Sequence, residues 1–478
     1  LIAILAFIIL SFAYFFPADI EGRILFQHDT AAGVGAGQES KEYLERTGER
    51  TRWTNSIFGG MPTYQMSPSY DSTTSLKGVE KVYRLFLPDY VVLTFIMMLG
   101  FYILLRAFGI SAWLAGLGGV IWAFSSYFFI LIPAGHIWKF VTLAYIPPTI
   151  AGVVLAYRKK YLLGGIVTAL FIALQIQSNH IQMSYYFMFV ILFFVGAYFE
   201  DAYKKKELPH FFKASGVLAL AAVVGVCINI SNLYHTYEYS KETMRGKSEL
   251  KQEGAAASQT SSGLDRDYIT NWSYGIGETL TLLVPNVKGG GSGSTMSQSE
   301  AAMAKANPMY NGIYSQLPQY FGEQPWTAGP VYVGAFVMFL FVLGCFIVKG
   351  PLKWALLGAT IFSILLSWGK NFMGLTDFFI DYVPMYNKFR AVSSILVIAE
   401  FTIPLLAIFA LKEILSKPDM LKQEKNCRGV IAALVLTAGV ALILAVAPGT
   451  FFSSFITTQE MTCLLYTSPS PRDAHESR

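Results

Sequence analysis

AVSSILVIAEFTIPLLAIFAL, residues 391–411, is an apolar run that contains a single charged residue, Glu400. A helix needs about 20 mainly apolar residues to cross the hydrocarbon core of a bilayer, so this run predicts a transmembrane helix. Its proline does not argue against a span, because membrane helices tolerate proline. The whole chain is 54% hydrophobic and only 14% charged, whereas soluble proteins carry about 25% charged residues. The sequence therefore predicts an all-α polytopic membrane protein.

Further apolar runs bring the number of predicted transmembrane helices to about eleven. The first run is shorter than the about 20 residues that a span needs, so we expect it to be a truncated span. The predicted spans cover residues 1–16, 89–107, 111–132, 140–157, 161–178, 181–199, 212–233, 331–348, 352–368, 391–411 and 429–447.

Lysine and arginine in the short connections predict the orientation, because these residues concentrate on the cytoplasmic side. With residue 1 inside, the inner connections hold fifteen of them and the short outer connections only four. Two long loops, residues 17–88 and 234–330, are then extracytoplasmic. The net charge of +5 arises from basic residues at membrane edges, so it does not indicate a nucleic-acid partner.

The two long loops differ in character. QESKEYLERTGERTRW (residues 38–53) has acids and bases three to four residues apart, which predicts a helix that is either solvated or lies on the outer leaflet. In the second loop, GAAASQTSSG (residues 254–263) and KGGGSGSTMSQSEAAMAKA (residues 288–306) are polar and rich in small residues. We predict that both stretches are linkers.

Asp29 lies in LFQHDT (residues 25–30), shortly after the first span and therefore near the outer membrane surface. A carboxylate there can act as a general base. It could also help to hold a divalent cation, or simply cap the helix that TAAG would begin. His28 beside it is either a site residue or an anchor at the membrane interface.

Other polar residues are predicted at the outer ends of spans. GHIWK places His136 and Lys139 at one outer turn, and four of the six histidines fall near the outer boundary. Taken singly, such residues are typical of helix ends anchored at the interface, but their clustering favours a site. Arginine binds phosphate through a planar fork of donors. The candidate substrate-binding residues are His28, Asn179, His180, Glu278, Lys388 and Arg390.

Glu400 is the one acid that is predicted deep inside a span. A charge at the centre of a span costs about 2.5–3.5 kcal/mol on insertion scales, so such residues usually face a cavity or a partner. Glu400 is therefore either a functional intramembrane acid or a protonated or paired acid in helix packing.

The C-terminal stretch CLLYTSPSPRD (residues 463–473) can be back-translated into a string that resembles a transposon-derived sequencing adapter. We therefore expect residues 463–478 to be a non-native tail and residues 1–462 to form the membrane region.

Five motifs, in this order, resemble the YfhO-like bacterial membrane proteins in the form common in Bacteroidetes. The resemblance covers nearly the whole of residues 1–462, and WTNSIFGG and YNKFRAVSS are its more specific parts. The motifs are RWTNSIFGGMPTYQ (52–65), SNHIQMSYY (178–186), NWSYGIGETLTLLVPN (271–286), YFGEQPWTAGPVYVGA (320–335) and VPMYNKFRAVSSILVI (383–398).

YfhO-like proteins resemble the GT-C glycosyltransferase superfamily, which implies a GT-C-like fold in the bacterial inner membrane with its active site on the outer face. The resemblance implies a polyprenyl-phosphate-linked sugar as donor and an extracytoplasmic glycan or lipid as acceptor. The superfamily's acid in the first outer loop, which acts as base or orients acceptor and metal, maps onto Asp29. It also makes Arg390 with Lys388 candidates for the lipid phosphate, and Asn179 with His180 candidates for the sugar or phosphate.

Two other functions remain open from the sequence. A transporter or flippase of lipid-linked saccharides would use Glu400 as its coupling acid and would leave Asp29 without a role. A structural or assembly protein of the envelope would need neither acid. The long first outer loop with an acid near the membrane favours the enzyme.

Overall fold

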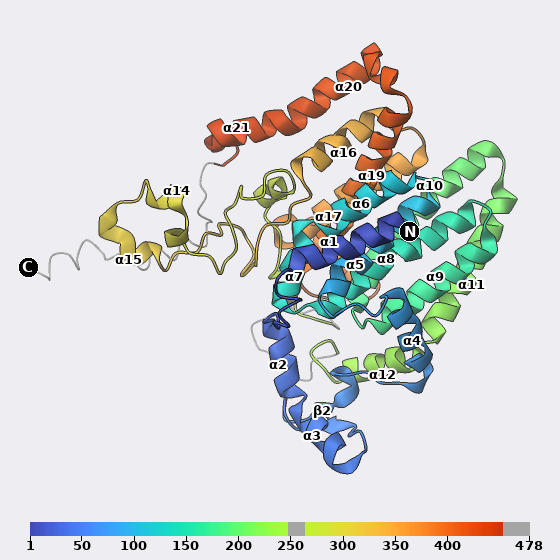
Figure 1. The fold of residues 1–478 in the computed structure, drawn as a ribbon, viewed down its shortest axis with the longest axis vertical. Helices are drawn as coiled ribbons and strands as arrows, with labels where there is room; N and C mark the ends of the chain where they lie inside the picture. Colours follow the sequence, from blue (N-terminus) through green and yellow to red (C-terminus); the bar gives the residue numbers. More distant parts are fainter. Residues whose placement is uncertain (247–262, 453–478) are drawn as a thin grey trace, which may run out of the picture.

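A computed structural model describes residues 1–246 and 263–452. In these residues nearly all regular structure is helical, as Figure 1 shows, which confirms the predicted all-α class. The one sheet pairs β1 (Trp53–Thr54) with β2 (Met61–Pro62) as antiparallel strands. The predicted tail, 463–478, and nearly all of the predicted linker 254–263 lie outside the described residues.

Within residues 1–246 and 263–452, five helices are long and apolar enough to cross a membrane, and two bent pairs would raise the number to seven. The pairs bend by 48° between α6 and α7 and by 109° after α17. The long helices are α8 (Ile137–Tyr157), α10 (Ile181–Lys205), α11 (Leu208–Cys227), α19 (Val397–Ser416) with the turn η8 (Val392–Leu396) before it, and α20 (Glu424–Leu434) continued by η10 (Val435–Gly439) and α21 (Val440–Val446). The pairs are α6 (Ala112–Ala123) with α7 (Ser126–Ala134), and α17 (Pro351–Ser367) with η6 (Gly369–Phe372) and α18 (Met373–Tyr382).

Four shorter apolar helices complete the body: α1 (Ile2–Phe15), α5 (Val91–Ala107), α9 (Tyr161–Gln177) and α16 (Ala335–Ile347). Each of the eleven predicted runs overlaps one of these helices or pairs, so helices are confirmed at those positions. By length and composition, five to seven of them can span a membrane. The architecture is that of an α-helical membrane protein.

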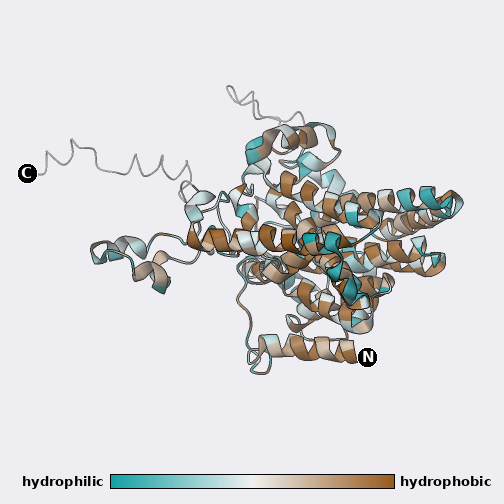
Figure 2. Ribbon diagram, turned by 90° about the horizontal axis from the view of Figure 1, so that it is seen from above, coloured by the Kyte–Doolittle hydropathy of each residue, from teal (hydrophilic) through white to brown (hydrophobic). Residues whose placement is uncertain are grey.

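The core is built around α8 and α19, which are almost wholly buried, whereas α10, α11 and α20–α21 are mostly exposed. Small residues allow close approach: a Cβ on Gly152 of α8 would lie 2.6 Å from the backbone nitrogen of Thr168 on α9. Such contacts are how membrane helices pack tightly. Figure 2 shows hydrophobic residues along the helices and hydrophilic ones mainly at helix ends and in loops.

Loops that were predicted to share a side do lie together. At one end, Arg158 donates to the Ala107 carbonyl over 2.5 Å and Lys159 pairs with Glu207 at 2.8 Å. These contacts join three connections that were predicted to be cytoplasmic. At the other end, Gln182 donates to the carbonyl of Arg390 over 2.7 Å, which joins two predicted outer turns.

The first long loop forms α2 (His28–Ala36), α3 (Gln38–Thr47), β1, β2 and α4 (Thr74–Tyr83). The predicted helix 38–53 is wrong at its end, because the chain leaves the helix at Gly48. This glycine has a φ of 75°, the left-handed conformation that commonly stops helices. Trp53 therefore lies in β1 instead of ending the helix.

The second long loop forms short helices, of which α14 (Glu300–Met303) and α15 (Asn311–Tyr314) project from the body (Figure 1). The prediction of a linker at 288–306 is wrong in part. Gly289 bridges to Tyr320, Thr295 bridges to Pro318, and Thr295 forms a capping box with Gln298. The helices of this region are α12 (Ile230–Ser240), α13 (Arg266–Thr270), η3 (Gly277–Leu282), α14 (Glu300–Met303) and α15 (Asn311–Tyr314).

Candidate functional site

A cavity of about 1670 Å³ opens where the first loop, the turn between α7 and α8, and the second loop meet. It is larger than the about 300–1,000 Å³ of most small-molecule pockets, so it has room for more than one substrate. Four of the predicted site residues line it, although they come from three distant parts of the chain: His28, Asp29, His180 and Arg390.

Asp29 lies in the first turn of α2, which begins at His28 and has Gln27 as its N-cap. The alternative that Asp29 caps this helix is therefore wrong. Gln27 donates to the Ile132 carbonyl over 2.7 Å, which holds the start of α2 against α7. A Cβ on Gly135 would lie 2.8 Å from the Thr30 nitrogen, so only glycine allows this close approach at its φ of 83°.

His136 is the partner of Asp29, with its Nε2 3.0 Å from Asp29 Oδ2. Burial lowers the pKa of His136 below 6.5, and the neighbouring Lys139 charge lowers it further; together they outweigh the opposite effect of Asp29. At neutral pH His136 is therefore uncharged, and a proton on Nε2 can be donated to the carboxylate. The other oxygen, Oδ1, lies 3.5 Å from Nδ1 of His28, whose side chain is exposed.

Lys139 and His180 contribute polar groups to the same cavity. Lys139 is buried on the first turn of α8, where Nζ donates to Ser394 Oγ over 3.1 Å and lies 5.2 Å from the centre of the Tyr127 ring. Burial, and then the Lys139 charge, lower the pKa of His180 to about 3. His180 is therefore neutral, and its Nδ1 has no hydrogen-bond partner among the described residues.

Arg390 is held by aromatic neighbours from the second loop. Its Nη1 donates to the Tyr268 hydroxyl over 2.6 Å, and its guanidinium lies 5.3 Å and 5.8 Å from the ring centres of Tyr268 and Trp272. This stacking fixes an exposed cation at the cavity wall, where it can meet an anionic group.

Lys388 and Asn179 do not join this cavity. The Lys388 ammonium donates to the Arg245 carbonyl over 2.7 Å, and Arg245 donates back to the Lys388 carbonyl. Asn179 has a left-handed φ of 61° and lines a smaller pocket, so it is separated from its neighbour His180. Lys388 was expected to act with Arg390, and Asn179 with His180. In each of these pairs only the second residue lines the cavity.

Glu278 is buried in the second loop and does not line the cavity. Its carboxylate accepts hydrogen bonds from the Tyr320 hydroxyl (2.5 Å) and from the backbone N–H groups of Gly275 (2.6 Å) and Glu323 (2.9 Å). This arrangement holds two segments of the loop, 275–278 and 320–323, together, which is a structural role.

The Glu278 side chain makes loop stability depend on pH. Burial raises its pKa above 4.5 and outweighs the hydrogen bonds, so its stabilising contribution is full below pH 4.5 and is lost as pH rises through the raised value. We expect the wild-type protein to lose thermal stability relative to Glu278→Gln as pH rises from about 4 to 8. Thermal unfolding in detergent measures this, with Glu300→Gln, at an exposed acid on α14, as control. Parallel curves for wild type and Glu278→Gln would contradict it.

Glu400 lies in the first turn of α19, fully buried, and it does not line the cavity. It accepts a hydrogen bond from Ser125 Oγ at the break between α6 and α7. The same break is held by Ser126, whose hydroxyl donates to the Pro330 carbonyl and accepts from the Tyr332 N–H. This geometry agrees with the second of the two alternatives predicted for Glu400, a protonated or paired acid in helix packing.

In the described parts of the chain, no group of three or more His, Cys, Asp or Glu side chains is placed to hold a metal ion. The Asp29 carboxylate and the His136 imidazole would supply two ligands to the divalent cation that was considered from the sequence.

His136 and Lys139 were not among the site residues predicted from the sequence. Both were predicted at an outer turn, but nothing in GHIWK indicates that this turn faces Asp29. Gln182, which donates to the Arg390 carbonyl and also lines the cavity, was missed for the same reason.

No family model, curated protein or solved structure that was compared with the chain matches it.

Proposed function

We propose that the chain is a membrane glycosyltransferase of GT-C type that moves a sugar from a polyprenyl-phosphate donor to an extracytoplasmic glycan or lipid. The observation that carries this proposal is the Asp29–His136 pair at 3.0 Å in a large cavity that Lys139 and Arg390 also line. A base and cations around one space are what transfer from a phosphate leaving group requires.

The proposed reaction is a single displacement with inversion. The oxygen of an acceptor hydroxyl forms a bond to the anomeric carbon and gives its proton to Asp29. The bond between that carbon and the phosphate oxygen breaks, and its electron pair remains on the lipid phosphate. Arg390 and Lys139 stabilise the phosphate charge, while neutral His136 orients the Asp29 carboxylate through its hydrogen bond.

We also propose that all eleven apolar helices or pairs cross the bacterial inner membrane, with the cavity on the outer face. The four shorter helices can do so where the bilayer thins or flanking residues reach the interface. The contacts among the basic loops at one end of the body support this orientation.

A transporter of lipid-linked saccharides is the weaker proposal. It needs Glu400 as a coupling acid along a path, whereas Glu400 is buried against Ser125 and lies outside the cavity lining. The enzyme is tested by supplying undecaprenyl-phosphate sugars and membrane glycans to the protein in vesicles and measuring release of undecaprenyl phosphate. Movement of the lipid across the bilayer without such release would favour the transporter.

The rate of this transfer is expected to fall below pH 6.5 in the wild-type protein. Protonation of His136 places a positive charge beside Asp29, which weakens the carboxylate as a base, and the lowered pKa of His136 puts this change below 6.5. His136→Gln keeps a donor for Asp29 but cannot titrate, so the acid limb assigned to His136 should disappear. His235→Gln, at an exposed histidine outside the cavity lining, should keep the wild-type profile. An unchanged profile in His136→Gln would remove His136 from the mechanism.

A further inference from the structure

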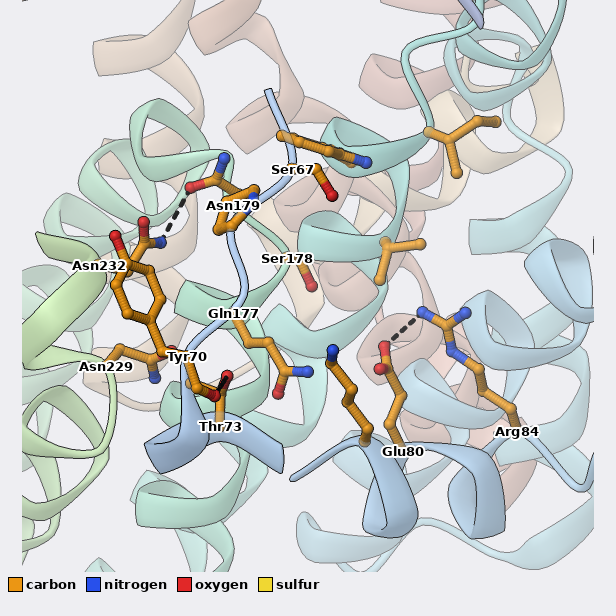
Figure 3. A pocket seen from close by; sticks show the side chains of 15 residues that line it. Ser67, Tyr70, Thr73, Glu80, Arg84, Gln177, Ser178, Asn179, Asn229 and Asn232 are labelled. Carbon is orange, nitrogen blue, oxygen red and sulfur yellow. Dashed lines mark hydrogen bonds and ion pairs between the residues drawn. The ribbon is translucent and has the colours of Figure 1, made fainter. Parts of the chain in front are cut away.

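A second, polar pocket of about 300 Å³ lies beside the main cavity. Figure 3 shows amide side chains from the ends of α9 and α12 on one side and the Glu80–Arg84 ion pair of α4 on the other. The lining also includes the indole of Trp138, a flat apolar surface on the first turn of α8. No role in the proposed reaction uses this pocket.

Several polar atoms in its lining have no hydrogen-bond partner among the described residues. They are the side-chain oxygens of Gln177, Asn229 and Asn232 and the hydroxyl of Tyr70. Asn229 and Asn232 are only 1% and 4% exposed. Leaving such groups unpaired costs about 1–3 kcal/mol each, so native proteins rarely retain them without a ligand or water.

The orientation of these amides is fixed by their other atoms. Asn229 Nδ2 donates to the carbonyls of Ala173 (3.0 Å) and Gly225 (3.3 Å), and Asn232 Nδ2 donates to Asn179 Oδ1 over 3.1 Å. Rotating either amide would lose these bonds. The unpaired oxygens of Asn229 and Asn232 are therefore acceptors, and they require a ligand that donates hydrogen bonds, whereas the Tyr70 hydroxyl can donate or accept.

The amide lining favours a neutral ligand over an anion. Amide oxygens repel anions and the Arg84 charge is already paired with Glu80 at 2.5 Å, although the exposed Lys77 adds one cation to the lining. A sugar ring offers several hydroxyl donors to the amides and a flat C–H face to the Trp138 indole, whereas a phosphate has no such face and brings negative charge to the amide oxygens.

We infer that this pocket is a carbohydrate subsite that binds one neutral sugar ring. The pocket and the main cavity share three lining residues, Arg84, Ile137 and Trp138. The left-handed turn at Asn179 places Asn179 in the lining of the pocket and His180 in the lining of the main cavity. A sugar in the pocket is therefore separated from the main cavity by one layer of side chains. That this sugar belongs to the acceptor rests on the proposed function; that the pocket binds a sugar does not.

The test measures binding to the full chain in nanodiscs by saturation-transfer NMR. The probes are glucose, galactose and N-acetylglucosamine at millimolar concentration, with inorganic phosphate as the anionic rival. We expect at least one sugar to bind, and Gln177→Leu or Asn232→Leu to weaken that binding at least tenfold. Asn311→Leu, at an exposed amide on α15, is the matched control. Because Gln177→Leu removes an unpaired buried oxygen, it should not lower the thermal stability of the sugar-free protein.

Three results would overturn the inference: no probe sugar binds, phosphate binds in place of sugar, or sugar binding survives both variants. The first would leave the pocket as a site for water only. Binding is also measured in Asp29→Asn, where it should persist. Sugar binding without any transfer would contradict the proposed function alone, and transfer without sugar binding would contradict this inference alone.

Discussion

Asp29→Asn is expected to lower the rate of sugar transfer by about 10²- to 10⁴-fold, the usual contribution of a general base. The amide keeps an oxygen that can accept the hydrogen bond of His136, so the local geometry should survive while the base is lost. The side chain is half exposed in the first turn of α2, and the substitution should leave thermal stability close to that of the wild type. The measurement is single-turnover release of undecaprenyl phosphate.

The matched control is Asp89→Asn, because Asp89 also lines the cavity but lies on the short connection before α5, away from His136 in the sequence. We expect its transfer rate to stay close to that of the wild type. Equal losses in both variants would mean that the cavity needs negative charge in general and would remove the assignment of Asp29 as the base. Full activity in Asp29→Asn would also remove the assignment of Asp29 as the base.

Arg390→Gln is expected to lower kcat/KM by about 10²- to 10³-fold, the effect of removing one preorganised group that meets developing charge. The guanidinium contacts the rings of Tyr268 and Trp272 and donates to the Tyr268 hydroxyl, so it contributes without further ordering when the phosphate arrives. Arg390→Lys should restore only part of the activity, because an ammonium keeps the charge but loses the stacking and the planar fork.

Lys388→Gln is the control for this prediction, because the sequence made Lys388 a candidate for the phosphate together with Arg390. The Lys388 ammonium is engaged with the Arg245 carbonyl, outside the cavity lining, so its loss should leave kcat/KM close to wild type. A larger loss in Lys388→Gln than in Arg390→Gln would show that the phosphate binds on the other side of this turn.

The helices could be predicted because they depend on composition: apolar runs fold as helices wherever lipid offers no partner for the backbone. The prediction of which loops share a side also held for the contacts described above, since it depends on basic residues that avoid translocation. Helix ends were less predictable. The stop at Gly48 depends on this one glycine adopting a left-handed conformation. The neighbouring residues in the stretch do not indicate that it will do so.

The site was only partly predictable, because the local sequence pattern does not show which residues of different loops lie close together in the fold. Asp29 and His136 meet only because α2 packs on the glycine turn between α7 and α8. Glu278 looked like a binding residue because it is polar and lies in a specific motif, yet that motif maintains the loop. Depth along a span was misleading for Glu400, since the helix break that it supports was invisible in the run of apolar residues.

The break between α6 and α7 also sets an order on how the protein can be assembled. The polar groups of Ser125 and Ser126 are satisfied by Pro330, Tyr332 and Glu400, which the ribosome adds some two hundred residues or more later. During synthesis the broken helix therefore has hydroxyl and backbone groups that lipid cannot satisfy. These groups must remain close to water until α16 and α19 arrive, so the packing around this break closes late in biogenesis.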